Sequence, residues 1–412
     1  MSESGDTKSC ELSVVRHSAM IGRKTALCLT VIFAVLIAIP PIHQLCVELK
    51  RTGRWRFLAL FQEVPTHASL KHFEETLASE SELAANARRF YQTWLLRWLG
   101  QGNDKIVVGR DGFLFFRTEV EMAAGPGFLR RRVVRQRGAQ DAAKRESRSN
   151  PIDVIVDFDR QLRSRGIHLV FVPIPVKPSI YPQEVWPGYP MSAGPAWNRD
   201  RTALKARLAD GGVDVLDVTD DLWQAKAQSD GKLFLKLDTH WTPHGLSVVA
   251  DRLAAHVEPH LPGPAQLVLT TRSQSVTNFG DLLRMLEVRS GSGLFTPQTV
   301  EIVQVLDGDK LAEGDDSAPV LLLGDSFANI YHRKELEWGE GAGLGEQLML
   351  RLGTGVQVIA INGGAATAVR EALAQKPAAL SRKKVVVWTC SVRDFFDESI
   401  TWERVPLAGE QP

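Results

Sequence analysis

The stretch Leu321-Leu322-Leu323-Gly324-Asp325-Ser326-Phe327-Ala328-Asn329 places a serine directly after a continuous apolar run. Apolar residues in a row, without alternation, are typical of a strand buried on both faces of a parallel sheet. In open parallel sheets, ligands bind beyond the carboxyl ends of the strands. A helix that begins behind Ser326 also offers backbone N–H groups to an oxyanion. Ser326 is therefore a candidate nucleophile, and the structural alternative is a helix N-cap.

Similar short apolar runs alternate with helical patterns over most of the chain. Strands are predicted at 167–173, 213–216, 300–305, 320–323, 356–361 and 385–389, and helices at 152–165, 202–209 and from 243 to about 256. This alternation predicts an α/β fold with a mainly parallel sheet flanked by helices on both faces. Upstream, Asp111-Gly112 separates two apolar runs within 106–116, which is typical of a β-hairpin.

A second stretch, Leu237-Asp238-Thr239-His240-Trp241-Thr242-Pro243-His244-Gly245, supplies a carboxylate and an imidazole two residues apart. In an extended segment both side chains lie on one face, because strand side chains alternate. With Ser326, they complete the nucleophile, base and orienting carboxylate of serine acyl transfer. Two alternatives stay open: Asp238 and His240 have structural roles only, or they bind a metal together with His244.

Three residues near predicted strand ends are candidates for supporting this chemistry. Asn362 and Gly363 follow the strand predicted at 356–361, where they either donate an amide to an oxyanion or form a turn. Lys177 follows the strand predicted at 167–173, where it either meets a carboxylate or supports the site.

Three more candidates lie close to the two key stretches in the sequence. Asn329 and Tyr331 come about one helical turn after Ser326, so we expect them to line the pocket. Trp241 follows His240 directly and either stacks on a sugar or packs in the core.

Composition limits the classes of function. The 412 residues carry a net charge of +1 with 24% charged residues, so no general nucleic-acid binding is predicted. Three of the four cysteines lie in or near the N-terminal apolar segment, which leaves no disulfide framework and no zinc-type cysteine pattern in the body. The sequence lacks dinucleotide and phosphate-loop motifs, and we predict neither a cofactor nor a resident metal.

The N-terminal region predicts a membrane anchor. From Thr25 to Val47 the 23 residues include no Asp, Glu, Lys or Arg, which is enough to span a bilayer. Pro40-Pro41-Ile42-His43-Gln44 offers no small-residue cleavage site, so an uncleaved anchor is preferred over a signal peptide. A buried core helix is the third alternative, and the segment has no polar face to support it. The predicted parts are a cytoplasmic tail at 1–24, the transmembrane anchor at 25–47, a helical linker at 48–105, the catalytic domain at 106–400 and a tail at 401–412.

Two regions outside the catalytic domain's strands have their own patterns. Residues 57–100 place apolar and aromatic residues at helical spacing, which predicts an amphipathic helix that packs on the main domain. The alternative is that these aromatic residues lie on the membrane surface. Residues 130–148 are rich in Arg, Gln and Ala and predict a solvated helix or loop, or else a surface that contacts a polyanion.

Four blocks, taken together, resemble a known family. Residues 108–115, 172–177, 237–245 and 324–327 occur in the order seen in the alginate O-acetyltransferase family of the AlgJ/AlgX type, whose core is an SGNH-hydrolase-like domain. The resemblance covers about residues 60–400, and Asp-Thr-His-Trp-Thr is its most specific part. It implies Ser326 as nucleophile, His240 as base and Asp238 as the third member, in the family's reversed chain order. Phe113 departs from the pattern, since a Trp is common there, and the family's carbohydrate-binding extension is not obvious.

The resemblance also implies a function and partners. We expect an O-acetyltransferase that moves an acetyl group through an acyl-serine to hydroxyls of an exported polysaccharide, either alginate-like or another exopolysaccharide. Acetyl groups would come from a membrane-bound O-acyltransferase, with the catalytic domain in the periplasm and the anchor in the bacterial inner membrane. Lys and Arg flank the apolar segment equally, so the expected orientation follows from this function and not from charge. A carbohydrate acetylesterase and a non-catalytic subunit of an acetylation complex are the alternatives.

Overall fold

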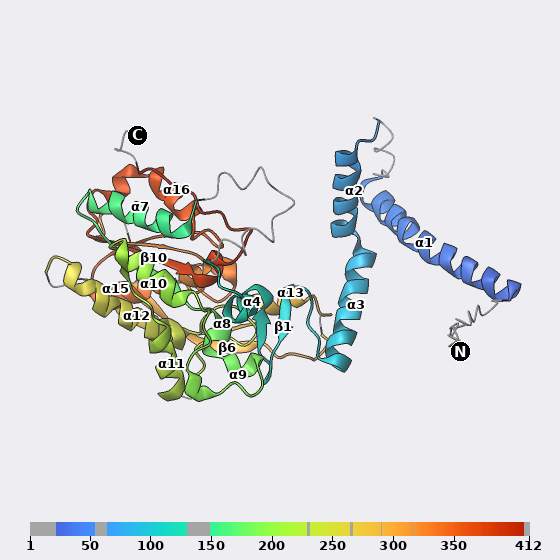
Figure 1. The fold of residues 1–412 in the computed structure, drawn as a ribbon, viewed down its shortest axis with the longest axis horizontal. Coiled ribbons are helices and arrows are strands. Elements are labelled where there is room, and N and C mark those ends of the chain that lie inside the picture. The colour runs from blue at the N-terminus through green and yellow to red at the C-terminus, as the bar shows by residue number, and fades with distance from the viewer. Residues whose placement is uncertain are drawn as a thin grey trace, which may run out of the picture. The chain divides into compact units, whose positions relative to one another are not determined.

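The computed structural model describes residues 22–53, 64–129, 149–228, 231–263, 267–289, 291–314 and 316–407 (Figure 1). The segment predicted at 130–148 lies outside the described residues, as do most of the predicted tail at 1–24 and the end of the tail at 401–412. The chain divides into two compact units, Met1–Phe90 and Tyr91–Pro412. Each unit is described by itself.

The first unit contains the long apolar helix. Helix α1 (Arg23–Thr52) continues through Pro40 and Pro41 and ends at Gly53, which adopts a left-handed conformation with φ of 65°. Within Arg23–Arg51, an 18-residue window has a mean hydropathy of 2.4 and is not buried inside the structure. By length and composition, the helix can therefore cross a membrane. This helix fits a single-pass membrane anchor. Helix α2 (His67–Glu80) follows, and α3 (Glu82–Leu99) runs on into the second unit.

The second unit is built on a five-stranded parallel sheet with the order β4-β3-β10-β8-β9. Its strands are β3 (His168–Ile174), β4 (Asp214–Val215), β8 (Val320–Gly324), β9 (Val356–Ala360) and β10 (Val385–Ser391). Strands β8 and β10 are buried along their whole length, because helices cover both faces of the sheet. The predicted α/β fold with a parallel sheet is confirmed.

Alternate residues of the strands point into two separate cores. Val170, Leu322 and Val387 face one core, together with residues of α11 (Thr219–Gln228), α12 (Pro243–Val257) and α15 (Leu344–Leu352). Leu321 and Trp388 face the other core, with residues of α7 (Pro151–Arg163), α10 (Arg201–Asp210) and α16 (Ala368–Ala374). Figure 1 shows α7 and α16 on one side of β10, and α12 and α15 on the other.

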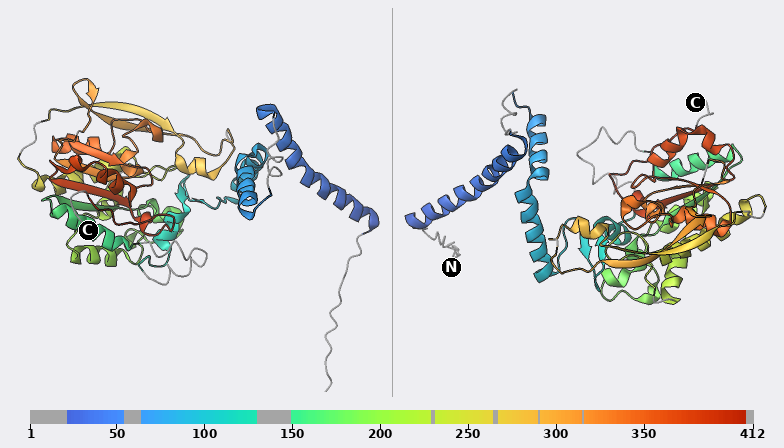
Figure 2. Two further views of the ribbon diagram at one scale, coloured as in Figure 1. Left: turned by 90° about the horizontal axis from the view of Figure 1, so that it is seen from above. Right: turned by 180° about the vertical axis from the view of Figure 1, so that it is seen from behind.

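One predicted strand belongs elsewhere. The run at 300–305 lies in β6 (Gln298–Asp307), which pairs antiparallel with β5 (Thr270–Asn278) and β7 (Lys310–Leu311) in a separate sheet. Its assignment to the parallel sheet was therefore wrong. Strand β5 escaped prediction because it is polar and largely exposed. The long ribbon of β5 and β6 appears outside the central sheet at the top of the left view in Figure 2.

The predicted hairpin is confirmed, and the predicted aromatic helix packs on the main domain in part. Strands β1 (Ile106–Val108) and β2 (Leu114–Phe116) pair antiparallel around Asp111 and Gly112, whose φ angles are 51° and 77°. In the second unit's part of α3, Tyr91, Trp94 and Trp98 are 60%, 47% and 70% exposed, whereas Leu96 packs against the core cluster that contains Ile106 and Leu114. The shorter helices are α4 (Arg117–Ala124), α8 (Lys177–Ile180), α9 (Pro182–Val185), α13 (Asp281–Leu286), α14 (Ser326–Asn329), η2 (Met191–Ala193), η3 (Glu258–His260), η4 (Lys334–Leu336), η5 (Pro377–Leu380) and η6 (Val392–Phe395).

Candidate active site

Ser326 lies where β8 ends and the short helix α14 begins. Asp325 is the N-cap of this helix, and its Oδ1 accepts a hydrogen bond of 2.9 Å from the Phe327 backbone N–H. The capping role therefore belongs to Asp325, and the Ser326 hydroxyl is not used for it. A Cβ atom at Gly324 would come within 2.6 Å of Thr389 Oγ1, so only glycine allows β8 to approach β10 this closely just before the serine.

Asp238 and His240 meet through a tight turn. The residues around them form bends, so the expectation of an extended segment was wrong. Asp238 Oδ1 accepts a hydrogen bond of 3.1 Å from the His240 backbone N–H, and it lies 2.6 Å from His240 Nδ1. The aspartate thus bonds both the main chain and the ring of the residue two positions on, which is a common local geometry for this side chain.

The Asp238 carboxylate is buried and held from several segments. Its Oδ2 accepts hydrogen bonds from Trp338 Nε1 at 2.9 Å and from the Asp281 backbone N–H at 3.0 Å. Burial alone would raise the pKa of Asp238, but His240 and these donors outweigh it and hold the pKa well below its usual range. The carboxylate therefore stays ionised. Trp338 and Asp281 were not predicted, because only the folded chain brings them to Asp238.

His240 is oriented by Asp238, and its other ring nitrogen has no partner in the described part of the chain. Burial by itself lowers the pKa of His240, but the Asp238 carboxylate outweighs burial and raises the pKa above its ordinary value. His240 Nε2 is buried and makes no hydrogen bond with any described residue, Ser326 included. The His240 ring lies against the ring of Phe327, with centroids 4.8 Å apart, so His240 packs against the residue next to Ser326.

Lys177 supports the Asp238–His240 turn through the main chain. Its fully buried Nζ donates hydrogen bonds to the backbone carbonyls of Leu235, Lys236 and Asp238, at 2.9, 3.2 and 2.7 Å. Burial lowers the pKa of Lys177 to about 8, so the group remains an ammonium with three donors at neutral pH. Of the two predicted roles, these bonds favour support of the site over a contact with a carboxylate.

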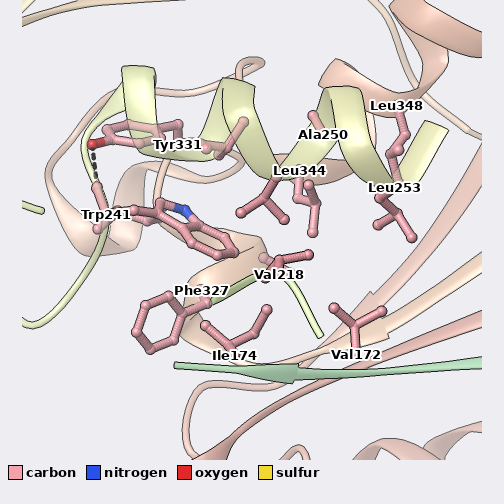
Figure 3. Packing of buried hydrophobic residues seen from close by; sticks show 14 of the residues in the cluster. Val172, Ile174, Val218, Trp241, Ala250, Leu253, Phe327, Tyr331, Leu344 and Leu348 are labelled. Atoms are coloured by element: carbon pink, nitrogen blue, oxygen red, sulfur yellow. Dashed lines mark hydrogen bonds between the residues drawn. The ribbon is translucent and has the colours of Figure 1, made fainter. Parts of the chain in front are cut away.

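Trp241 and Tyr331 lie in the core and not on a pocket surface. Both side chains are fully buried, and the Tyr331 hydroxyl donates a hydrogen bond of 2.8 Å to the Trp241 carbonyl (Figure 3). Trp241 packs edge-on against Phe327, with ring centroids 5.0 Å apart. Sugar stacking on Trp241 and a pocket-lining role for Tyr331 are therefore replaced by packing that supports the strand ends.

Asn329 connects the serine helix to the loop after β9. Its Nδ2 donates hydrogen bonds to the Ala360 carbonyl at 3.2 Å and to Asn362 Oδ1 at 2.9 Å. The Ile361 backbone N–H donates to the Gly324 carbonyl at 3.0 Å, so this loop lies at the same sheet edge as Ser326. Asn362 and Gly363 are exposed there. Because Asn362 accepts through Oδ1, its Nδ2 group is the part left to donate.

Comparison with known proteins identifies the family. Residues 106–392 match the model of the SGNH hydrolase-like domain, acetyltransferase AlgX. The chain belongs to this family. The resemblance of the four sequence blocks to AlgJ/AlgX-type proteins is thereby confirmed.

Curated relatives and solved structures agree with the AlgX family assignment. A probable alginate O-acetylase AlgJ from Pseudomonas aeruginosa is 32% identical over 236 residues, covering 55% of this chain and 53% of the relative. The AlgJ of Azotobacter vinelandii is 28% identical over 239 residues, covering 56% of each protein. The chain thus spans about half the length of the curated relatives it matches.

Two solved structures share the fold. The O-acetyltransferase domain of Pseudomonas putida AlgJ is 22% identical with a TM-score of 0.52, covering 71% of this chain and 94% of that one. Pseudomonas aeruginosa AlgX is 17% identical with a TM-score of 0.50, covering 69% and 61%. At these sequence identities, the likeness to the two structures shows the fold of this chain alone.

Asp238, His240 and the neighbouring Asp281 also resemble a group of metal ligands. Donor atoms of Asp238, His240 and Asp281 lie within 4.8 Å of one another, and His244 is not part of this group. Asp281 is already engaged, since it accepts hydrogen bonds from Thr239 N–H at 2.8 Å and Thr239 Oγ1 at 2.6 Å. Both Asp238 oxygens also accept hydrogen bonds. The two carboxylates therefore suit the orientation of the His240 imidazole better than the binding of a metal.

Proposed function

We propose that this chain is an O-acetyltransferase that carries an acetyl group on Ser326 and transfers it to hydroxyls of an exported polysaccharide. One observation carries the proposal: His240 has Nδ1 fixed on Asp238 at 2.6 Å and a buried Nε2 that has no hydrogen-bond partner among the described residues. An imidazole held in this way is prepared to accept a proton from a nearby hydroxyl. The ring contact between His240 and Phe327 supports Ser326 as that hydroxyl.

The reaction then has two proton-balanced steps. His240 Nε2 removes the Ser326 Oγ proton while Oγ attacks the carbonyl carbon of the acetyl donor, and the leaving group departs with that proton. A polysaccharide hydroxyl next gives its proton to His240 and attacks the acyl-serine, and Ser326 Oγ leaves as the proton returns to it. Asp238 stabilises the imidazolium at both steps, and base assistance of this kind is worth roughly 10²–10⁴-fold.

Asn362 and Gly363 are the proposed donors to the oxyanion that forms on the acyl carbon. The support is that Asn329 ties the Asn362 loop to the serine helix by a hydrogen bond of 2.9 Å. Removing one such donor costs about 10²–10³-fold in rate. Lys177 supports the site indirectly, because it holds the backbone that carries Asp238.

The substrate and location follow from the relatives' names and from α1. The curated relatives are named alginate O-acetylases, which supports an alginate-like or other exopolysaccharide as acceptor. Helix α1 fits a single-pass anchor, and we place it in the bacterial inner membrane with the catalytic unit in the periplasm. Acetyl donors are made in the cytoplasm, so a membrane-bound O-acyltransferase is the proposed source of acetyl groups.

The test is direct detection of the acyl-serine. The full chain in detergent is incubated with an activated acetyl ester, digested and analysed by mass spectrometry, before and after addition of acceptor oligosaccharide. We expect acetyl on Ser326, its disappearance with acceptor, and acetylated oligosaccharide. Ser326→Ala should show none of these, and Ser399→Ala, at an exposed serine, should behave as wild type.

Two results would overturn parts of the proposal. Free acetate as the product in the presence of acceptor would make the protein an esterase. Absence of acetyl on Ser326, with polysaccharide modification retained in cells that carry Ser326→Ala, would make it a non-catalytic subunit.

A further inference from the structure

Three histidines and one aspartate form a second cluster in the catalytic unit, away from Ser326. His168 Nε2 lies 2.8 Å from Asp214 Oδ2. His256 Nε2 lies 3.0 and 2.9 Å from the two oxygens of the same carboxylate. The His260 ring stacks on the His168 ring, with centroids 3.9 Å apart and planes 16° apart. These four residues are the histidine cluster.

The histidine cluster lies at the sheet edge opposite to Ser326. His168 is the first residue of β3, whereas Ser326 follows the last residue of β8, and both strands are parallel to β10. Helix α12 links the two edges, because it begins just after His240 and contains His256 in its last turn. Its length is about 22 Å, at 1.5 Å per residue. The cluster is therefore separate from the proposed catalytic residues.

The donor set is that of a transition-metal site. Imidazole nitrogens and a carboxylate oxygen are the usual non-thiolate ligands of Zn²⁺, typically four in number. Single ligand atoms of His168, Asp214 and His260 already lie within 4.8 Å of one another. His256 and His260 are four positions apart across the end of α12, the spacing that brings two side chains to one helix face.

Exposure and neighbours also suit an ion. The side chains of His168, Asp214 and His256 are 33%, 27% and 26% exposed, so they are fixed by packing but open to solvent. His260 is exposed, so its ring can rotate toward the Asp214 carboxylate without displacing buried atoms. The Nε2 atoms of His168 and His256 already lie next to the Asp214 carboxylate. A shared ion would bind at this carboxylate.

We propose that His168, Asp214, His256 and His260 bind one Zn²⁺-type divalent ion. The ion ties the C-terminal end of α12 to the first residue of β3 and to β4. It is a structural ion, since its ligands lie at the far end of the helix that follows His240. It makes the catalytic unit more stable and leaves the chemistry at Ser326 unchanged.

The test measures Zn²⁺ on the full chain, purified in detergent with a tag that contains no histidine. After chelator treatment and dialysis against Zn²⁺, elemental analysis should give one ion per chain. Zn²⁺ at about 100 times its Kd should raise the melting temperature by roughly 3–6 °C. His260→Ala and Asp214→Asn should each weaken binding at least tenfold and remove this rise.

Two control variants separate the cluster from other sites. His72→Ala changes an exposed histidine of α2, and His240→Ala changes the proposed catalytic base, so both should keep one ion per chain. Loss of the ion in His240→Ala would move the site to Asp238 and Asp281. Stoichiometric binding that survives His260→Ala, or no retained Zn²⁺ in the wild type, would leave the cluster as a set of ordinary hydrogen bonds and overturn the proposal.

Discussion

Trp338 Nε1 donates a hydrogen bond of 2.9 Å to Asp238 Oδ2, although the two residues are 100 positions apart in the sequence. The Asp281 backbone N–H donates to the same oxygen, and His240 engages the other one. The orientation of the Asp238 carboxylate is thus set by segments from three parts of the chain. Each segment can be tested separately.

Trp338→Phe keeps the aromatic packing and removes one donor to Asp238. Hydrogen bonds to charged groups contribute about 1.5–3 kcal/mol, so we expect a loss of folding free energy of that order. Without this donor Asp238 becomes more basic and raises the pKa of His240 further. The acidic limb of the kcat/KM profile should therefore move to higher pH, with a loss of roughly tenfold in rate at neutral pH.

Trp402→Phe is the matched control for this change. Trp402 is also buried, and its Nε1 donates to the Asp394 carbonyl at 3.1 Å and not to Asp238. This variant should lose stability and keep the wild-type pH profile. An identical pH profile in Trp338→Phe would show that the Trp338 hydrogen bond has no influence on the base.

Asp238→Asn should have the opposite effect on the pH profile. The carboxylate raises the pKa of His240 against the effect of burial, so its removal leaves burial to lower that pKa. The acidic limb of kcat/KM should move to lower pH, and the rate should fall by roughly 10³–10⁴-fold because the imidazole loses its orientation. Asp281→Asn, 3.9 Å from His240 Nδ1, should shift the limb in the same direction by less. Equal shifts in both variants would contradict a special role for Asp238.

Lys177→Met should loosen the turn that carries Asp238 and His240. The change leaves the carbonyls of Leu235, Lys236 and Asp238 without their shared donor, which we expect to cost about 2 kcal/mol of folding free energy and more than tenfold in kcat/KM. Lys226→Met is the comparison, because burial also lowers the pKa of Lys226 to about 8 and its Nζ donates to the Ile180 carbonyl. Denaturant melts and kinetics of both variants should show that only Lys177→Met changes catalysis.

Gly280→Ala should displace the Asp238 carboxylate. Gly280 has φ of 82°, and an added Cβ would lie 2.5 Å from the Leu237 carbonyl oxygen and 2.8 Å from Asp238 Cβ. We expect a loss of about 3 kcal/mol or more, with a matching loss of activity. Gly263→Ala, with φ of 77° and no atom within 4 Å, should cost only about 1 kcal/mol and stay active. Equal melting temperatures for the two variants would contradict the close contact at Gly280.

The strands of the parallel sheet could be predicted because each is a short, unbroken apolar run. Strand β8 and the serine after it are the clearest example. Strand β5 could not be predicted in this way, since its residues are polar and stay exposed. The run at 300–305 was placed in the wrong sheet, because the sequence of one strand indicates its burial but not the strand with which it pairs.

The site was predictable as a set of residue types and not as a geometry. Asp238 and His240 stand out by their motif, but the turn that joins them is visible only in the folded chain. Trp338 and Lys177 act through contacts with residues that are distant in the sequence, and a local sequence pattern does not predict such contacts. The histidine cluster escaped prediction for the same reason.

Strand β10 is the last strand of the sheet in the sequence, yet it lies between β3 and β8. During synthesis, the edges of β3 and β8 that pair with β10 therefore stay unpaired until the last strand has been made. A product that stops short of Val385 would lack the strand that joins β3 and β4 to β8 and β9.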